Sequence, residues 1–274
     1  KLLGILATPN RDKREFLLVY DGDQCIGRLR GAALTPTTFM IRGFAATDEN
    51  RQDEVTQALG TWLYDSFSAD NGTITSWETS DPEGTMVRAI NTMLEQAGFR
   101  EHRRKIFVRK ELDGYASPYD DPFTSRTLHV IGRNEFIAAM TTASEGDMFE
   151  EEERNPEREF DELIEYAGSA FDPNHWRMAL LDGIPAAVVL PQPYHDAPHK
   201  GTLFYIGVLP AFRGRGFGKI LHAAGLEYLA RVPVATYVGS TDTRNTAMAA
   251  GFQRNGCVVS DDIQLFYKAD QDKV

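Results

Sequence analysis

The chain has 274 residues, of which 42% are hydrophobic and 25% are charged, and its formal net charge at pH 7 is -11. This composition excludes an intrinsically disordered chain, and the acidic balance disfavours binding to nucleic acid or to an anionic membrane surface. The two cysteines, Cys25 and Cys257, are far apart and have no metal-ligand spacing. We therefore expect no disulfide framework, no metal site and no membrane span, and a cytoplasmic location.

The order of the predicted elements is repeated along the chain, at an offset of roughly 160 residues. Each half begins with a strand, an Asp-Gly turn and a second strand, at residues 17–27 and 178–190. A β-rich run, a helix, a strand, a helix that ends in glycine and a closing strand follow in both halves. In the first half these are residues 37–44, 52–67, 73–79, 85–98 and 104–110, and in the second half 201–208, 218–230, 235–241, 245–256 and 262–268.

The repeat predicts two domains of one α/β fold built on a mixed sheet, residues 1–115 and 126–274, joined by a turn-rich linker at 116–125. The second half has an additional leading segment: a strand at 126–132, a helix near Asn134 and an acidic helical stretch at 150–171. Four apolar residues recur in this stretch at helical spacing: Phe160, Leu163, Ile164 and Ala167. The first half is expected to lack this leading segment.

A glycine-rich turn connects the strand at 201–208 to the helix that follows it. Pro210 ends the strand, and three glycines and three cations come next: Arg213, Gly214, Arg215, Gly216, Gly218 and Lys219. Glycines let a ligand approach the backbone amides, and the first turn of a helix offers unpaired N–H groups with a partial positive charge. The turn is therefore predicted to bind an anion, most simply a phosphate.

Two common phosphate-binding motifs do not fit this turn. A P-loop needs Ser or Thr after Gly-Lys and a first glycine five positions before the second. Counted from Gly218, Ile220 and Arg213 occupy these places. The dinucleotide fingerprint needs a third glycine three residues after the second, where this chain has Lys219. What remains is a strand that ends in Val-x-Pro, followed by Arg-x-x-Gly-x-Gly.

This pattern closely resembles motif A of the GNAT superfamily of N-acetyltransferases, Gln/Arg-x-x-Gly-x-Gly/Ala. Arg213, Gly216 and Gly218 match its core, and Val208 and Pro210 match its upstream extension. The resemblance covers residues 127–268. Downstream, family members often have Asn, then Tyr seven residues later and Gly-Phe at eleven and twelve. This chain keeps the register with Asn245, Met248 and Gly256. It departs in two side chains, Phe252 in place of Tyr and Cys257 in place of Phe.

The resemblance implies an acetyltransferase that uses acetyl-CoA and no metal to acetylate a primary amine of a small acceptor. The pyrophosphate is expected on the amides of residues 213–219, and a backbone N–H of Gly207 or Val208 is expected to face the thioester oxygen. The residues expected to bind the coenzyme are Ile206, Gly207, Val208, Arg213, Gly214, Arg215, Gly216, Phe217, Gly218, Lys219, Asn245, Met248 and Phe252.

The groups that move protons are less defined in the sequence. Phe252 stands where family members often use Tyr to protonate the leaving thiolate, and is itself either a core residue or a wall of the coenzyme site. Another group or water then protonates the thiolate, or it leaves unassisted; Tyr205 and Tyr237 are nearby by strand order. His195, in the polar loop at 191–201, is a candidate general base, and a solvated loop is the competing interpretation. The acidic run at 150–153 either attracts a cationic acceptor or is a solvated helix face.

Three interpretations of the whole chain remain open. The first is an acetyl-CoA-dependent transferase whose first half is a degenerate copy, since that half has "FAATDENRQDE" where the glycines would fall, and these carboxylates repel pyrophosphate. The second is a coenzyme-binding sensor without turnover. The third is a tandem transferase like mycothiol synthase, with a cysteinyl-glucosaminyl-inositol acceptor. The sequence does not determine the acceptor, nor whether the chain is a monomer or a homodimer.

Overall fold

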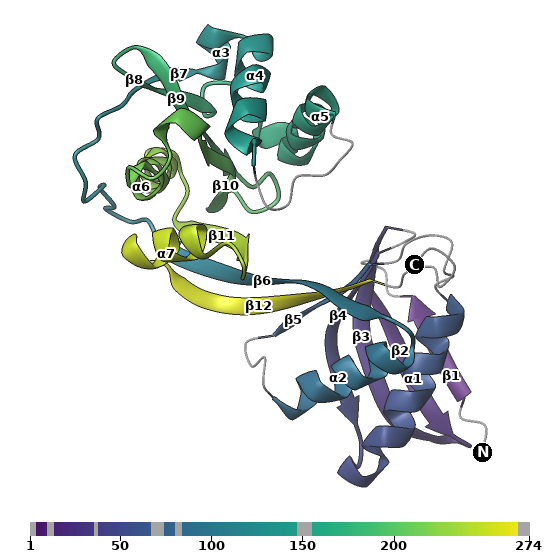
Figure 1. Ribbon diagram of the computed structural model, residues 1–274. Helices are drawn as coiled ribbons and strands as arrows, with labels where there is room; N and C mark the ends of the chain where they lie inside the picture. Colours follow the sequence, from purple (N-terminus) through teal and green to yellow (C-terminus); the bar gives the residue numbers. More distant parts are fainter. Residues whose placement is uncertain are drawn as a thin grey trace. The chain divides into compact units, whose positions relative to one another are not determined.

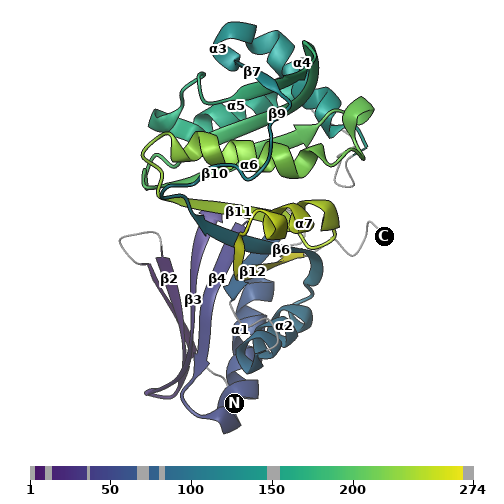
Figure 2. The same ribbon diagram turned by 90° about the vertical axis from the view of Figure 1, so that its left-hand side faces the viewer.

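The computed structural model describes residues 4–9, 14–35, 38–66, 74–79, 84–146 and 155–267. The chain divides into two compact units, one made of Lys1–Phe107 and Ser260–Val274 and the other of Val108–Val259. Figures 1 and 2 show the elements of both units from two sides. None of the described helices is long and apolar enough to cross a bilayer.

The first unit is a mixed sheet with two helices packed against each other on it (Figure 1). Its strand order is β1-β2-β3-β4-β5-β12-β6, in which β4 and β5 are parallel. The elements are β1 (Gly4–Pro9), β2 (Arg14–Asp21), β3 (Gln24–Thr35), β4 (Thr38–Ala46), α1 (Gln52–Ser66), β5 (Ile74–Thr79), α2 (Thr85–Gln96), β6 (Arg100–Glu111) and β12 (Val258–Tyr267). A short 3-10 helix, η1 (Glu49–Arg51), precedes α1.

Turn chemistry fixes the boundaries of these elements as the sequence predicts. Gly22 has a φ of 60° in the Asp-Gly turn between β2 and β3, and Gly98 has a φ of 84° just after α2. A leading strand, however, is present in the first unit, where none was expected: β1 pairs antiparallel with β2. The prediction missed it because a short apolar run at residues 2–7 carries no clear period.

The second unit has the strand order β6-β11-β10-β9-β8-β7, in which β10 and β11 are parallel. Its elements are β7 (Thr124–Thr127), α3 (Leu128–Ile131), α4 (Arg133–Ser144), α5 (Pro156–Ala167), η3 (Gly168–Ala170), β8 (Arg177–Leu181), β9 (Ile184–Pro193), β10 (Lys200–Val208), η4 (Pro210–Phe212), α6 (Phe217–Ala230), β11 (Thr236–Asp242) and α7 (Thr246–Arg254).

Alternate residues of β9 face the two sides of this sheet. Val188 and Leu190 belong to the hydrophobic core beneath α4 and α5, whereas Ala187 and Val189 pack with Leu221 of α6. The uninterrupted apolar run of β9 follows from this burial on both faces. Helices α4 and α5 therefore lie on one side of the sheet and α6 on the other.

The strand predicted at 126–132 is wrong beyond its first residues. Strand β7 pairs with β8 only from Thr124 opposite Leu180 to Thr127 opposite Arg177, where β8 begins. Without a partner strand, the chain turns into α3, which ends where Gly132 takes a φ of 87°. The acidic stretch forms α5 from Pro156 onward, and the acidic run at 150–153 lies outside the described residues.

The two halves of the sequence exchange their closing strands. From Ser260 onward β12 belongs to the first unit, where it pairs antiparallel with β5, and Arg104 Nε contacts both carboxylate oxygens of Asp262 at 2.9 Å. The end of β6 belongs to the second unit, where Leu112 N–H donates to Ala235 O at 2.8 Å. The compact units therefore differ from the sequence segments 1–115 and 126–274, and residues 116–125 lie within the second unit.

Candidate active site

The glycine-rich turn leads directly into α6. Gly214 and Gly216 have φ values of 74° and 77°, and Gly216 is the N-cap of α6 without a side-chain cap. A Cβ built at Gly214, Gly216 or Gly218 would meet no atom within 4 Å. The first amides of α6 therefore face open space, and their unpaired N–H groups and the helix dipole favour an anion there.

Strand β10 separates from its parallel neighbour before it reaches the turn. It pairs with β11 at Lys200 and Gly201, while its pairing with β9 continues as far as Val208. Leu209 N–H donates to Ala186 O at 2.9 Å, on the β9 side. Because successive residues of a strand alternate the side to which their N–H and C=O groups point, the N–H of Val208 faces the open edge.

A cavity of about 760 Å³ extends from this open edge to the first turn of α6. We call it the slot. Eleven of the residues predicted to bind the coenzyme line it: Ile206, Gly207, Val208, Arg213, Gly214, Gly216, Phe217, Gly218, Lys219, Asn245 and Met248. Its remaining walls come from Ala143, Gly146, Tyr205, Phe212, Ala247, Gly251 and Arg254. The Asn245 side chain also caps α7 by accepting from Met248 N–H at 3.0 Å.

Arg213 lines the slot, but its guanidinium contacts the protein itself. Nε donates to Val208 O at 3.0 Å, Nη1 to Glu145 O at 2.7 Å and Nη2 to Ala143 O at 3.0 Å. Two of these carbonyls end α4, where the helix leaves such groups without helical partners. Arg213 therefore fastens the strand end to α4. Arg215, also predicted to bind coenzyme, is not a lining residue, and its guanidinium lies over the Phe217 ring at 4.8 Å.

Phe252 is a core residue and does not line the slot. It is 2% exposed and packs edge-on against the ring of His222, which in turn contacts Tyr237. Gly251, the preceding residue on α7, lines the slot instead. One helical position separates the two by about 100°, enough to turn Phe252 into the core. Tyr237 is excluded from the slot for the same reason, because it is 1% exposed and lies beside His222 Nε2 at 3.3 Å.

Tyr205 is the phenol that reaches the slot. A Cβ on Gly207 would lie 2.8 Å from the Tyr205 hydroxyl and 2.9 Å from Ala143 Cβ, so the glycine allows this close approach. The register of β10 against β9 shifts between Leu203 and Ile206. Such a bulge re-aims side chains, and it places the Tyr205 hydroxyl next to the strand segment that the open edge exposes.

His195 lies away from the slot. Strand β9, which ends just before His195, pairs there with the beginning of β10, because Pro193 stands opposite Gly201. The His195 ring lies 3.3 Å from a Cβ built on Gly168. Val208, at the other end of β10, is on the order of 20 Å away at the usual rise per residue. His195 therefore cannot reach an acceptor at Val208.

Burial raises the pKa of the Cys257 thiol to about 11, so this cysteine stays protonated and is not a nucleophile.

Sequence reasoning missed several walls of the slot. Ala143 and Gly146 end a helix nearly 70 residues before the motif, and no local pattern connects them with it. The segment before β7 does not line the slot but contacts two residues that do: the Lys219 ammonium lies 5.1 Å from the centre of the Tyr119 ring, and Phe123 packs edge-on against Phe217 at 5.1 Å. The predicted linker therefore packs against the first turn of α6.

The corresponding turn of the first unit is built differently. Asp48 follows β4, and its carboxylate accepts a hydrogen bond from Asn50 N–H at 2.9 Å, at the start of η1. Arg51 pairs with Asp21 and Glu54 at 2.8 Å. Carboxylates thus occupy the place where the second unit offers glycine amides. Among the described residues of either unit, no His, Cys, Asp and Glu side chains cluster as metal ligands do.

Comparison with known proteins agrees with this geometry. The sequence profile of the acetyltransferase (GNAT) family matches residues 137–256, which hold the slot. In this region the chain is similar to the GNAT family. A mycothiol acetyltransferase of Rhodococcus erythropolis is 32% identical over 92 residues, 31% of each chain. One of Streptomyces griseus is 30% identical over 100 residues, 36% of this chain and 32% of the relative. The matched region thus spans about a third of these relatives.

Solved structures show the same fold over nearly the whole chain. A GCN5-related N-acetyltransferase from Sphaerobacter thermophilus superposes with a TM-score of 0.62 at 19% identity, over 92% of this chain and 80% of that one. A tandem GNAT protein from the clavulanic acid biosynthesis pathway gives 0.54 at 16% identity, over 94% and 84%. At such identities the likeness establishes the fold alone: the chain has the mixed-sheet, tandem architecture that the repeat predicts.

Proposed function

We propose that the protein is an N-acetyltransferase that transfers an acetyl group from acetyl-CoA to a primary amine of a small acceptor. The observation that carries the proposal is the continuity of one cavity. The slot joins an uncapped, glycine-lined helix start, which suits a pyrophosphate, to a strand edge with an inward-facing N–H at Val208. Its volume of about 760 Å³ is in the range of cofactor sites.

The residues of the slot fit this coenzyme. The amides of residues 214–219 would hold the pyrophosphate, and Lys219 would add a cation, while the unpaired part of β10 would offer its backbone to the pantetheine arm as a neighbouring strand does. When bound, acetyl-CoA supplies an acetyl thioester, from which a primary amine takes the acetyl group: the C–N bond forms, the C–S bond breaks, nitrogen loses a proton and sulfur gains one.

Two groups of this chain would assist the transfer. The Val208 N–H would donate to the carbonyl oxygen as negative charge develops on it, and one such donor is worth roughly 3–4 kcal/mol in characterised enzymes. The Tyr205 hydroxyl would give its proton to the departing sulfur and regain one from solvent, while water accepts the proton of the amine. A general acid contributes on the order of 10²–10⁴-fold.

A second candidate is a mycothiol acetyltransferase, favoured by the relatives of that name. Their similarity covers only about a third of this chain, so the acceptor that their name implies needs its own test. Release of thiol from acetyl-CoA in the presence of the cysteinyl-glucosaminyl-inositol acceptor, at a rate above that with simple amines, would establish this candidate. Equal or slower release would eliminate it.

For the first unit we propose a structural role without coenzyme. The support is the Asp48 carboxylate at the start of η1, which already accepts from Asn50 N–H. Pyrophosphate there would meet this charge together with those of Glu49 and Glu54. A binding stoichiometry of one acetyl-CoA per chain is expected, and a stoichiometry of two would contradict this assignment.

The experiment that tests the donor is calorimetric titration of acetyl-CoA into the wild type and a Gly218→Glu variant. Gly218 lines the slot and has open space around it, so glutamate there should keep the fold and abolish binding by bulk and charge. Gly43→Glu is the matched control, because Gly43 also has open space but lies in β4. The absence of saturable binding by the wild type would overturn the proposal.

Turnover separates the transferase from a coenzyme-binding sensor. Thiol release is measured with acetyl-CoA and a panel of primary amines, with the Gly218→Glu variant as the blank. Acceleration by any amine above the hydrolysis rate supports the transferase. Tight binding of acetyl-CoA without acceleration by any member of a broad panel would favour the sensor.

A further inference from the structure

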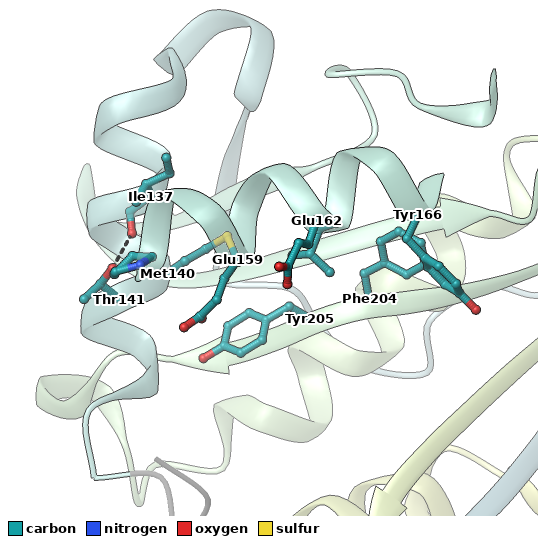
Figure 3. A pocket seen from close by; sticks show the side chains of 10 residues that line it. Ile137, Met140, Thr141, Glu159, Glu162, Tyr166, Phe204 and Tyr205 are labelled. Atoms are coloured by element: carbon teal, nitrogen blue, oxygen red, sulfur yellow. Dashed lines mark hydrogen bonds between the residues drawn. The ribbon is translucent and has the colours of Figure 1, made fainter. Parts of the chain in front are cut away.

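A second cavity, of about 470 Å³, lies between α4, α5 and β10 in the same unit (Figure 3). We call it the side pocket. Its described walls are Ile137, Met140 and Thr141 of α4, Pro156, Glu159, Glu162, Leu163 and Tyr166 of α5, and Phe204 and Tyr205 of β10. Tyr205 lines both cavities, so the side pocket meets the slot at the phenol whose hydroxyl approaches Gly207.

The local sequence explains how these side chains converge. Glu159, Glu162, Leu163 and Tyr166 recur at spacings of three and four, which place them on one face of α5. In a regular strand Phe204 and Tyr205 would point to opposite faces, but the bulge between Leu203 and Ile206 lets both line the pocket. Figure 3 shows the two glutamates on the side of α5 that faces these rings.

The walls combine apolar surface with carboxylates. Ile137, Met140, Leu163 and Phe204 contribute hydrocarbon, and the Tyr166 and Phe204 rings lie 5.3 Å apart. The Thr141 hydroxyl donates to Ile137 O at 2.9 Å, within its own helix (Figure 3). Glu162 accepts from Arg158 Nε at 2.9 Å in an exposed ion pair, which offsets part of its charge. The charged groups among the described walls, Glu159 and Glu162, are thus both anionic.

This combination selects for one kind of acceptor. An ammonium group gains charge-assisted hydrogen bonds from carboxylates and attraction from aromatic faces, while an apolar body gains from burial against the hydrocarbon. A polyhydroxylated acceptor would bring hydroxyl groups against hydrocarbon, which offers them no hydrogen bonds, so burying it there is unfavourable. An acidic acceptor would be repelled by Glu159 and Glu162.

We infer that the side pocket binds the acceptor of the proposed reaction, and that this acceptor is a cationic primary amine on an aryl or branched alkyl body. Glu159 and Glu162 recruit the ammonium form, and the amine becomes neutral by loss of a proton to water before attack. The inference rests on the proposed function for the donor site, but it assigns specificity to α4, α5 and the β10 bulge. It predicts that the enzyme prefers apolar amines to sugar-based ones.

The test uses phenethylamine as the aryl amine and glucosamine as the polyhydroxylated one, with saturating acetyl-CoA and thiol release as the readout. We expect kcat/KM to be at least tenfold higher for phenethylamine. In the Glu159→Gln/Glu162→Gln double variant, KM for this amine should rise about tenfold while acetyl-CoA affinity stays unchanged. Glu165→Gln, on α5 but outside the side pocket, is the matched control and should behave as wild type.

Charge and body are separated by a neutral analogue. Phenethyl alcohol should inhibit the wild type with an inhibition constant at least tenfold higher than the KM for phenethylamine, and the double variant should narrow this difference. Equal or better use of glucosamine, or an unchanged KM in the double variant, would overturn the inference. Calorimetric titration of phenethylamine into enzyme without acetyl-CoA keeps the two proposals distinct, because the donor proposal fails only if acetyl-CoA does not bind.

Discussion

Arg213 and Val208 are joined by a hydrogen bond from Nε to the carbonyl oxygen, at 3.0 Å. The same guanidinium holds the carbonyls of Ala143 and Glu145 at the end of α4. One residue of the glycine-rich turn therefore fixes the strand end whose N–H faces the slot. The motif position that the sequence assigns to charge attraction serves instead to keep two walls of the cavity in register.

An Arg213→Lys variant tests this role. Lysine keeps the positive charge, but its single nitrogen cannot span three carbonyls. We expect the free energy of unfolding to fall by about 1–2 kcal/mol and acetyl-CoA affinity to fall by roughly tenfold. Denaturant unfolding and calorimetry measure the two effects. Arg215→Lys is the control and should alter neither. If Arg213→Lys also leaves both quantities unchanged, charge alone matters at this position and the bridging role is contradicted.

Gly218 and Gly225 of α6 are predicted to respond to alanine in opposite ways. A Cβ at Gly218 meets open space, so Gly218→Ala should stabilise the helix by up to about 1 kcal/mol while obstructing the slot. A Cβ at Gly225 would lie 2.8 Å from Leu203 Cδ1, so Gly225→Ala should destabilise by about 1–3 kcal/mol. Thermal unfolding and acetyl-CoA titration of each variant check this, and unchanged binding by Gly218→Ala would contradict it.

Tyr205→Phe is expected to lower kcat by on the order of 10²-fold without changing acetyl-CoA affinity, because it removes the phenol nearest Gly207. Phe252→Tyr, which restores the residue that family members often have, should not raise the rate. Phe252 is buried against His222, so its added hydroxyl would enter the core and cost about 1–3 kcal/mol. A faster Phe252→Tyr enzyme would show that this position does reach the slot.

His222 makes the second unit sensitive to acid. Burial, with a smaller contribution from Lys110, lowers the pKa of His222 to about 4, and its ring lies between Tyr237 Oη and Asn255 Nδ2. Because Asn255 Nδ2 also donates to Lys219 O, the His222 proton sits on Nε2. The folded state thus holds a neutral imidazole, whereas the unfolded chain binds a proton below its ordinary pKa of about 6.5.

The neutral His222 therefore destabilises the fold in acid. Its contribution to the free energy of unfolding is fully present above about pH 6.5 and is lost as the pH falls toward 4, by about 3 kcal/mol in total. Denaturant unfolding at pH 7 and pH 4.5 should show a drop in wild type that His222→Gln lacks, once the common titration of carboxylates is subtracted. An identical pH dependence in both proteins would contradict the assignment.

Much of the fold was predictable because its signals are local. Period-two patterns, the Asp-Gly turn and glycine at the ends of helices set element boundaries within a few residues, and the glycine-rich turn identified the slot. Ala143 and Gly146 are not predictable from local sequence, because they reach the slot only through tertiary packing. For Phe252 the resemblance leaves a core position and a wall of the slot open; the structure places it in the core, and the adjacent Gly251 lines the slot.

The side pocket was beyond sequence reasoning for a different reason. Its aromatic pair depends on the bulge between Leu203 and Ile206, and a bulge has no mark in this strand because its residues are ordinary strand formers. His195 is a candidate in the sequence because a histidine in a polar loop is a conspicuous signal, whereas Glu159 carries no such signal. The carboxylates of α5 resemble a solvated helix face in the sequence.

The exchange of closing strands has a consequence for synthesis of the chain. Thr79 of β5 pairs with Asp262 of β12, which lies roughly 180 residues later in the sequence. Contacts between such distant residues slow folding. The ribosome must therefore synthesise β12 before the first unit can complete its sheet. Until then β5 presents an unpaired edge, which is a site for association with other chains. Truncation near residue 260 would therefore harm the N-terminal unit first, although the lost residues belong to the other half of the repeat.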